Sequence, residues 1–133
     1  MPTATVKYLG ELRTISTHVG SGDEVTMDAP VDNHGRGEAF SPTDLLCTSL
    51  ASCMIITMAI SARKNGFELE EASAEVTKVM ADAPRRVGEI QITIKMTGDY
   101  TDEQRSILEA AALNCPVAKS LSSEVKQVVK FEY

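Results

Sequence analysis

Two of the three cysteines in this chain could carry redox chemistry. Cys53 lies inside the apolar stretch 45–60, where a cysteine is usually a small buried hydrophobe and burial makes its thiol inert. Cys115 precedes Pro116, at the predicted start of a short helix, where free backbone N–H groups favour a thiolate. Cys47 faces away from Cys53, since six helical residues turn through ~600°, a net ~120°, and we interpret it as packing. For the other two thiols, the residues alone leave both interpretations open.

A thiol that reduces a peroxide rapidly also needs a positioned cation, because negative charge develops on the departing oxygen. Arg63 is explained as a cation at a helix C-terminus, and Arg85 and Arg86 belong to a predicted turn. The remaining candidates are Arg13, in or next to a predicted strand, and Arg36, in a predicted loop.

One long helix is predicted over residues 41–65, and it carries Cys53. Ser41 suits the N-cap and Pro42 suits the first helical position, while Asp44 complements the helix dipole. The helix is apolar or small on every side, so either protein or lipid must enclose it. Because its apolar run is shorter than the ~20 residues of a membrane span and contains three hydroxyl residues, we expect a buried core helix and no membrane.

The rest of the chain alternates as strands do or repeats as amphipathic helices do. In the first predicted strand Ala4, Val6 and Tyr8 share one face, as in a half-buried strand. The sequence from Thr101 to Gln104 matches the capping-box motif of a helix N-terminus. The expected strands are 3–9, 13–19, 24–28, 72–80, 90–96 and 125–131, and the expected later helices begin at 101 and 116. The order βββ-α-ββ-αα-β predicts an α+β fold, a single domain over 1–133, with an antiparallel sheet on each side of the central helix.

Composition excludes several classes of function. A net charge of −6 without a Lys/Arg cluster argues against nucleic-acid binding. The cysteines lack the short spacing of a zinc knuckle, and His18 and His34 are too few and too far apart for a metal site. The first residues do not resemble a signal peptide, so we expect a cytoplasmic protein with reduced thiols.

One chain of this size has little surface with which to wrap a helix that is apolar all round. We therefore predict a homodimer in which the partner covers the rest of the helix.

The segments SPTDLLCTSLASCM and NCPVAKSLS resemble the OsmC/Ohr family of osmotically induced and organic-hydroperoxide-resistance proteins. The resemblance covers nearly the whole chain, including the order of elements. It implies an intertwined homodimer with two active sites at the interface, a peroxidatic Cys53 and a resolving Cys115. It further implies reduction of organic hydroperoxides without a cofactor, with electrons from an external dithiol such as a lipoyl group.

This sequence differs from the peroxidase branches of that family at one position near the start of the long helix. Those branches place a glutamate at the start of the helix, paired with an arginine that polarises the peroxide. Here Thr43 occupies the position of that glutamate, with Asp44 beside it. Arg13 is the natural match for the arginine. FSPTDLL and DAPVDNHGRGEAF look closer to a less-characterised branch.

Our first hypothesis is a thiol peroxidase that forms a Cys53 sulfenate and then a Cys53–Cys115 disulfide. Arg13 would stabilise the thiolate and the leaving oxygen, and Thr43 and Asp44 would orient Arg13. The second hypothesis is a dimeric redox-sensing or small-ligand-binding protein with little turnover, which the missing glutamate favours. The third is a purely structural dimer with inert cysteines.

Overall fold

The structure is a computed structural model that describes residues 1–133. The observed order of elements confirms the predicted one, with a short 3-10 turn, η1 (Val31–Asn33), added inside the long loop. The chain forms two compact units, Met1–Leu46 and Cys47–Tyr133. The single domain over residues 1–133 stays a prediction.

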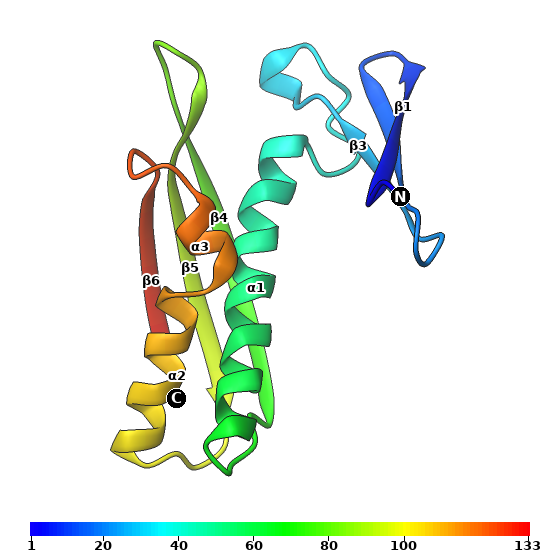
Figure 1. The fold of residues 1–133 in the computed structure, drawn as a ribbon. Helices are drawn as coiled ribbons and strands as arrows, with labels where there is room; N and C mark the ends of the chain where they lie inside the picture. The colour runs from blue at the N-terminus through cyan, green and yellow to red at the C-terminus, as the bar shows by residue number, and fades with distance from the viewer. The chain divides into compact units, whose positions relative to one another are not determined.

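The first unit is built on an antiparallel three-stranded sheet in the order β1-β2-β3 (Figure 1). Its strands are β1 (Ala4–Gly10), β2 (Arg13–His18) and β3 (Glu24–Asp28). The β2–β3 register places Arg13 opposite Asp28 and Thr17 opposite Glu24. The predicted three-stranded meander is therefore confirmed, with the turn between β2 and β3 at residues 19–23.

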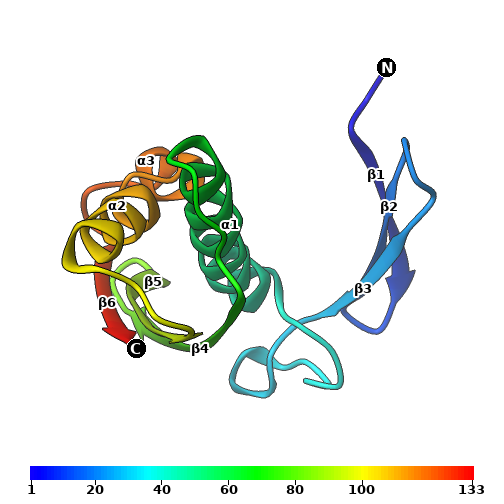
Figure 2. The ribbon, with the colours of Figure 1, turned by 90° about the horizontal axis from the view of Figure 1, so that it is seen from below.

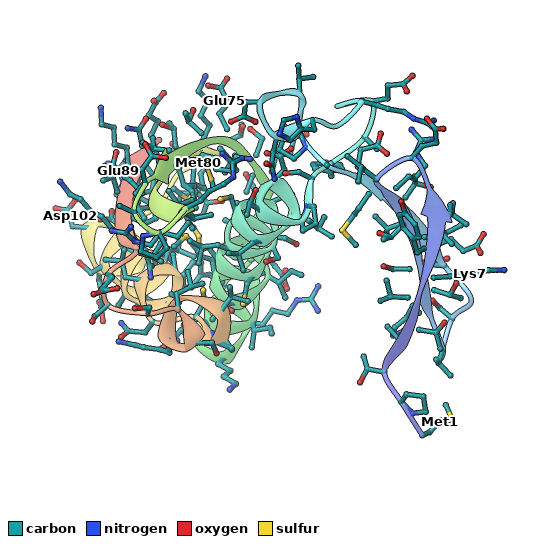
Figure 3. All side chains as sticks on the ribbon, turned by 90° about the horizontal axis from the view of Figure 1, so that it is seen from above. Met1, Lys7, Glu75, Met80, Glu89 and Asp102 are labelled. Carbon is teal, nitrogen blue, oxygen red and sulfur yellow. The ribbon has the colours of Figure 1, made fainter.

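The expectation that β1 is half-buried is wrong for this chain. Val6 is 68% exposed and Tyr8 is 63% exposed, although the two share one face as predicted. Side chains project from both faces of this sheet, and Lys7 points away from it (Figure 3). The alternation of residues along a strand sets where side chains point, but it does not decide whether anything covers that face.

In the second unit, three helices lie on one face of a curved sheet with the order β4-β5-β6 (Figure 2). The core between these layers contains Leu50, Met54, Ile92 and Leu108, each at most 1% exposed. The unit contains α1 (Pro42–Lys64) from Cys47 onward, followed by β4 (Glu71–Ala81), β5 (Arg86–Thr97), α2 (Asp102–Leu113), α3 (Pro116–Ser120) and β6 (Lys126–Glu132).

The second sheet is mixed, so the prediction that both sheets are antiparallel is wrong here. β4 and β5 form the expected antiparallel hairpin, whereas β6 runs parallel to β5, with Ile92 opposite Val129. A tight hairpin forces antiparallel pairing, but a helical crossover returns the chain in the same direction. The crossover here is α2 followed by α3.

Capping residues mark the starts of α1 and α2, as predicted. At the start of α1 the Asp44 N–H donates to Ser41 Oγ and the Ser41 N–H donates to the Asp44 carboxylate, both at 3.0 Å. At the start of α2 the Gln104 N–H donates to Thr101 Oγ1, and the Thr101 N–H donates to Gln104 Oε1. Each pair forms a reciprocal capping box, which satisfies backbone N–H groups that the first turn leaves unpaired.

This chain covers only one side of α1. Leu50, Met54 and Met58 are fully buried, whereas Ile56 is 57% exposed and Ile60 is 49% exposed. By length and composition alone α1 could cross a membrane, with a mean hydropathy of 2.0 over its most apolar window. That test is weak for a single helix, because the core helices of soluble proteins pass it too.

Candidate active site

Cys53 lies in the middle of α1, at the border between the buried and the exposed sides of the helix. Its side chain is partly exposed and packs against the edge of the core. Its Sγ lies 3.9 Å from the Thr57 hydroxyl, one helical turn further on. Cys47 is 1% exposed within the core, which confirms the interpretation that it packs.

Cys115 lies at the N-cap of α3, and its side chain is fully buried. The side chain of Cys53 lies close enough to the Cys115 thiol to raise its pKa. Packing of α3 beside α1 therefore brings together two sulfur atoms that are distant in sequence.

The two thiols stand in different surroundings. Burial raises the pKa of the Cys115 thiol, and the contact with Cys53 raises it further. The backbone N–H groups of Val117 and Ala118 act in the opposite direction but do not prevail. Burial therefore outweighs the effect of the helix N-terminus on Cys115, because α3 has only five residues and the sulfur is shielded from water. A partly exposed cysteine thus stands beside a buried one whose thiol pKa is raised.

The first unit contains a second polar cluster, centred on Arg13. Its guanidinium donates two hydrogen bonds to Asp28, from Nε to Oδ1 at 2.6 Å and from Nη2 to Oδ2 at 2.8 Å. The Glu38 backbone N–H donates to Oδ2 at 3.1 Å. The bonds from Arg13 hold the pKa of the Asp28 carboxyl below its usual range, and Asp28 raises the pKa of Arg13.

Thr43 and Asp44 lie at the start of α1, where they help to build its N-terminus. The Thr43 hydroxyl lies 3.1 Å from Ser41 Oγ, and the Asp44 carboxylate accepts the Ser41 N–H. The carboxylate that holds Arg13 in a bidentate pair is Asp28, which sequence reasoning missed. The observed register places Asp28 opposite Arg13, whereas the predicted turn at 20–23 would have shifted the pairing by two residues.

The other candidate cation, Arg36, makes looser contacts. Its guanidinium lies 3.6 Å from the Glu11 carboxylate and 3.9 Å from that of Glu38. Its side chain is 39% exposed, against 26% for Arg13. Arg13 is therefore the better-held arginine of the first unit.

The family model described as OsmC-like protein matches residues 35–130. Because this match covers most of the chain, the protein belongs to the OsmC-like protein family.

Similar proteins support this assignment at several distances. A crystal structure from Psychrobacter arcticus, described as that of a candidate osmotic stress induced and detoxification response protein, is 49% identical. It has a TM-score of 0.94, and the match covers 99% of this chain and 96% of that one. A Legionella pneumophila structure named as an organic hydroperoxide resistance protein OsmC shares the fold, with a TM-score of 0.76, 18% identity and coverage of 100% and 98%. An uncharacterised Acinetobacter baylyi protein is 22% identical over 77% of this chain and 73% of that protein.

Proposed function

We propose that the protein is a thiol-dependent peroxidase that reduces organic hydroperoxides. The observation that carries this proposal is the contact between a partly exposed Cys53 and a buried Cys115. Membership of the OsmC-like family supports it. Names that refer to organic hydroperoxide resistance among proteins of the same fold point in the same direction.

The reaction has three steps. The Cys53 thiolate attacks the terminal oxygen of the hydroperoxide, the O–O bond breaks, and the alkoxide takes a proton to leave as an alcohol. Cys53 becomes a sulfenic acid, whose sulfur the Cys115 thiol attacks, so that an S–S bond forms and water leaves. An external dithiol then supplies two electrons and two protons by exchange and becomes a disulfide itself.

The different surroundings of the two thiols assign these roles. Cys53 is partly exposed, so a peroxide can approach it, whereas Cys115 is fully buried and remains a protonated thiol until a sulfenic acid forms beside it. Because the two side chains interact, the proposed disulfide joins neighbouring residues.

We assign the cation to Arg13, which would stabilise the thiolate and the departing oxygen. Thr43 and Asp44 hold the first turn of α1 and were predicted to orient this arginine. No metal or cofactor takes part in the scheme, since the two thiols carry both electrons.

A second copy of the chain is the proposed partner. The exposed isoleucines of α1, Ile56 and Ile60, and the uncovered β1 present apolar surface that a homodimer would bury. The organic hydroperoxide is the substrate, and the reductant is a dithiol, with lipoyl groups as one source. The cycle suits the cytoplasm, where thiols are kept reduced.

Replacing Cys53 by serine tests the proposal directly. We expect the Cys53→Ser variant to lose all consumption of cumene hydroperoxide with dihydrolipoamide as reductant, because a serine hydroxyl cannot be oxidised to a sulfenate. Cys115→Ser should still be oxidised once but should not form the internal disulfide. Cys47→Ala is the matched control and should keep its activity. Turnover by Cys53→Ser would rule the mechanism out.

The redox-sensor alternative is favoured by Thr43, which replaces the family glutamate. Mass spectrometry after one equivalent of hydroperoxide separates the two functions. A Cys53–Cys115 disulfide with steady turnover supports the peroxidase, whereas the same disulfide without turnover supports a sensor. Absence of the disulfide would leave the structural dimer.

A further inference from the structure

Asp28 is the one charged residue of this chain that is buried. It is 1% exposed, and the only other buried polar residue is Ser41. A buried carboxylate is costly unless charged and polar partners surround it. Since every other carboxylate and cation of the chain is at least partly exposed, this burial calls for a physical reason.

The partners of Asp28 fix the plane of a guanidinium. Oδ1 and Oδ2 accept from Nε and Nη2 of Arg13 at 2.6 and 2.8 Å. Two parallel bonds of this kind define the orientation of an arginine as well as its position. The carboxylate is itself held, because Oδ2 accepts the Glu38 N–H and the Asp28 N–H donates to the Phe40 carbonyl.

Arg13 keeps part of its surface open. Its side chain is 26% exposed, whereas the Asp28 side chain is 0% exposed. The pair therefore presents a cation outward on a buried anionic support. An unsupported arginine on a strand would sample many rotamers, so its charge would be spread over a large volume.

We propose that Asp28 is the positioning residue for Arg13, the role predicted for Thr43 and Asp44. This inference rests on the proposed peroxidase function, in which Arg13 stabilises the departing oxygen. Asp28 touches neither substrate nor sulfur in this scheme and acts only through the arginine. The Asp44 carboxylate serves the start of α1 by accepting the Ser41 N–H.

A simpler explanation is that Asp28 only anchors the loop 29–40 through the Glu38 N–H. The two carboxylate oxygens of Asp28 have different partners, so the anchoring of the loop can be distinguished from the positioning of Arg13. Oδ1 accepts from Arg13, while Oδ2 accepts from both Arg13 and the Glu38 N–H. An Asp28→Asn side chain keeps one oxygen for the loop but loses the charge and one acceptor for the guanidinium.

The test compares Asp28→Asn with Glu38→Gln, a matched control that also removes a carboxylate near Arg13. The Glu38 side chain is 63% exposed and lies 3.8 Å from Arg13, too far to orient it. We expect Asp28→Asn to lower kcat/KM for cumene hydroperoxide by about 10- to 100-fold, as is usual when the support of a functional group is removed. Glu38→Gln should stay within about threefold of the wild type, since surface charges contribute little.

Two further measurements exclude a merely structural role. Alkylation of Cys53 by iodoacetamide produces no alkoxide, so its rate should fall much less in Asp28→Asn than the peroxide rate does. In an Arg13→Gln background, Asp28→Asn should have no additional effect, because the two residues act as a unit. If Asp28→Asn does not fold, Asp28→Glu keeps the charge but displaces the guanidinium by one methylene, and it should still lose several-fold in kcat/KM.

Wild-type kcat/KM in the folded Asp28 variant would overturn the positioning role while leaving the peroxidase intact. Equal losses of kcat/KM for Asp28→Asn in the wild-type and Arg13→Gln backgrounds would overturn it too. A wild-type protein that consumes no hydroperoxide would instead overturn the proposed function, and the inference with it.

Discussion

The two units bury residues of opposite character. In Cys47–Tyr133 the buried residues are apolar side chains and cysteines from α1, β5, α2 and α3, together with Tyr100. In Met1–Leu46 the only two buried residues are Asp28 and Ser41, both polar. The second unit thus has a hydrophobic core, whereas the first is held by hydrogen bonds and ion pairs, of which only Arg13–Asp28 includes a buried residue.

This difference has a physical consequence. A small sheet gains independent stability mainly from a covered apolar face, and no apolar side chain of β1 to β3 is fully buried. The first unit therefore depends on another surface, which the proposed homodimer would provide. The second unit can hold its two thiols in contact by packing alone.

The largest expected effect concerns the uncovered side of α1. Ile56→Asp would place a charge in the proposed dimer interface, where an uncompensated buried charge costs about 3–5 kcal/mol. We expect the dimer to dissociate at micromolar concentration, as measured by analytical ultracentrifugation. Leu113→Asp, at a 48% exposed position on α2, is the control. A wild-type monomer, or an Ile56→Asp variant that assembles normally, would contradict the dimer.

The second-largest effect is expected from shortening a side chain in the hydrophobic core of the second unit. Leu50→Ala should lower the free energy of unfolding by about 2–5 kcal/mol, because it leaves a cavity at a fully buried position. Leu113→Ala removes the same atoms from an exposed position and should change stability by about 0.5 kcal/mol or less. Urea denaturation measures both, and similar costs would mean that the core is misassigned.

The ion pair of the first unit predicts a dependence on pH. The folded state depresses the pKa of Asp28, so its contribution is present above the usual carboxyl pKa of about 3.9 and is lost as the pH falls through the lower folded value. The difference in urea midpoint between the wild type and Asp28→Asn should therefore be constant from pH 7 to about 5 and narrow below about pH 4. A difference in urea midpoint that does not change with pH would show that the charge of Asp28 does not stabilise the fold.

The smallest effect is local. Thr101→Ala removes the hydroxyl that accepts the Gln104 N–H at the start of α2, at a cost of about 1 kcal/mol. Ser106→Ala, at an exposed position within the same helix, is the control and should be nearly neutral. Thermal unfolding followed by circular dichroism compares the two, and equal melting temperatures would argue against the capping box.

Local sequence signals predicted most of the fold. The caps at Ser41 and Thr101 depend on residues three positions apart, so neighbouring residues suffice to specify them. The alternation of Ile90, Ile92 and Ile94 likewise identified a strand with one buried face. The direction of β6 was missed, because strand alternation is the same in parallel and antiparallel sheets.

The candidate site was predicted in part. Cys53 and Cys115 were identified through their motifs, and the structure places them in contact. Asp28 was overlooked because nothing in its immediate neighbours indicates a partner fifteen residues earlier in the chain. The sequence left the state of Cys115 open, since a position before Pro116 indicates a helix start but not the depth of burial.

By itself, the sequence determined the order of the elements, the long apolar helix and the two cysteine motifs, because each is written in residues a few positions apart. Only the tertiary structure decided which carboxylate holds Arg13, that burial raises the pKa of Cys115, and that one side of α1 stays exposed. These features depend on distant segments packing together. The physical reason is that the pKa and the exposure of a side chain depend on which distant residues bury it or pair with it. No pattern of neighbouring residues contains that information.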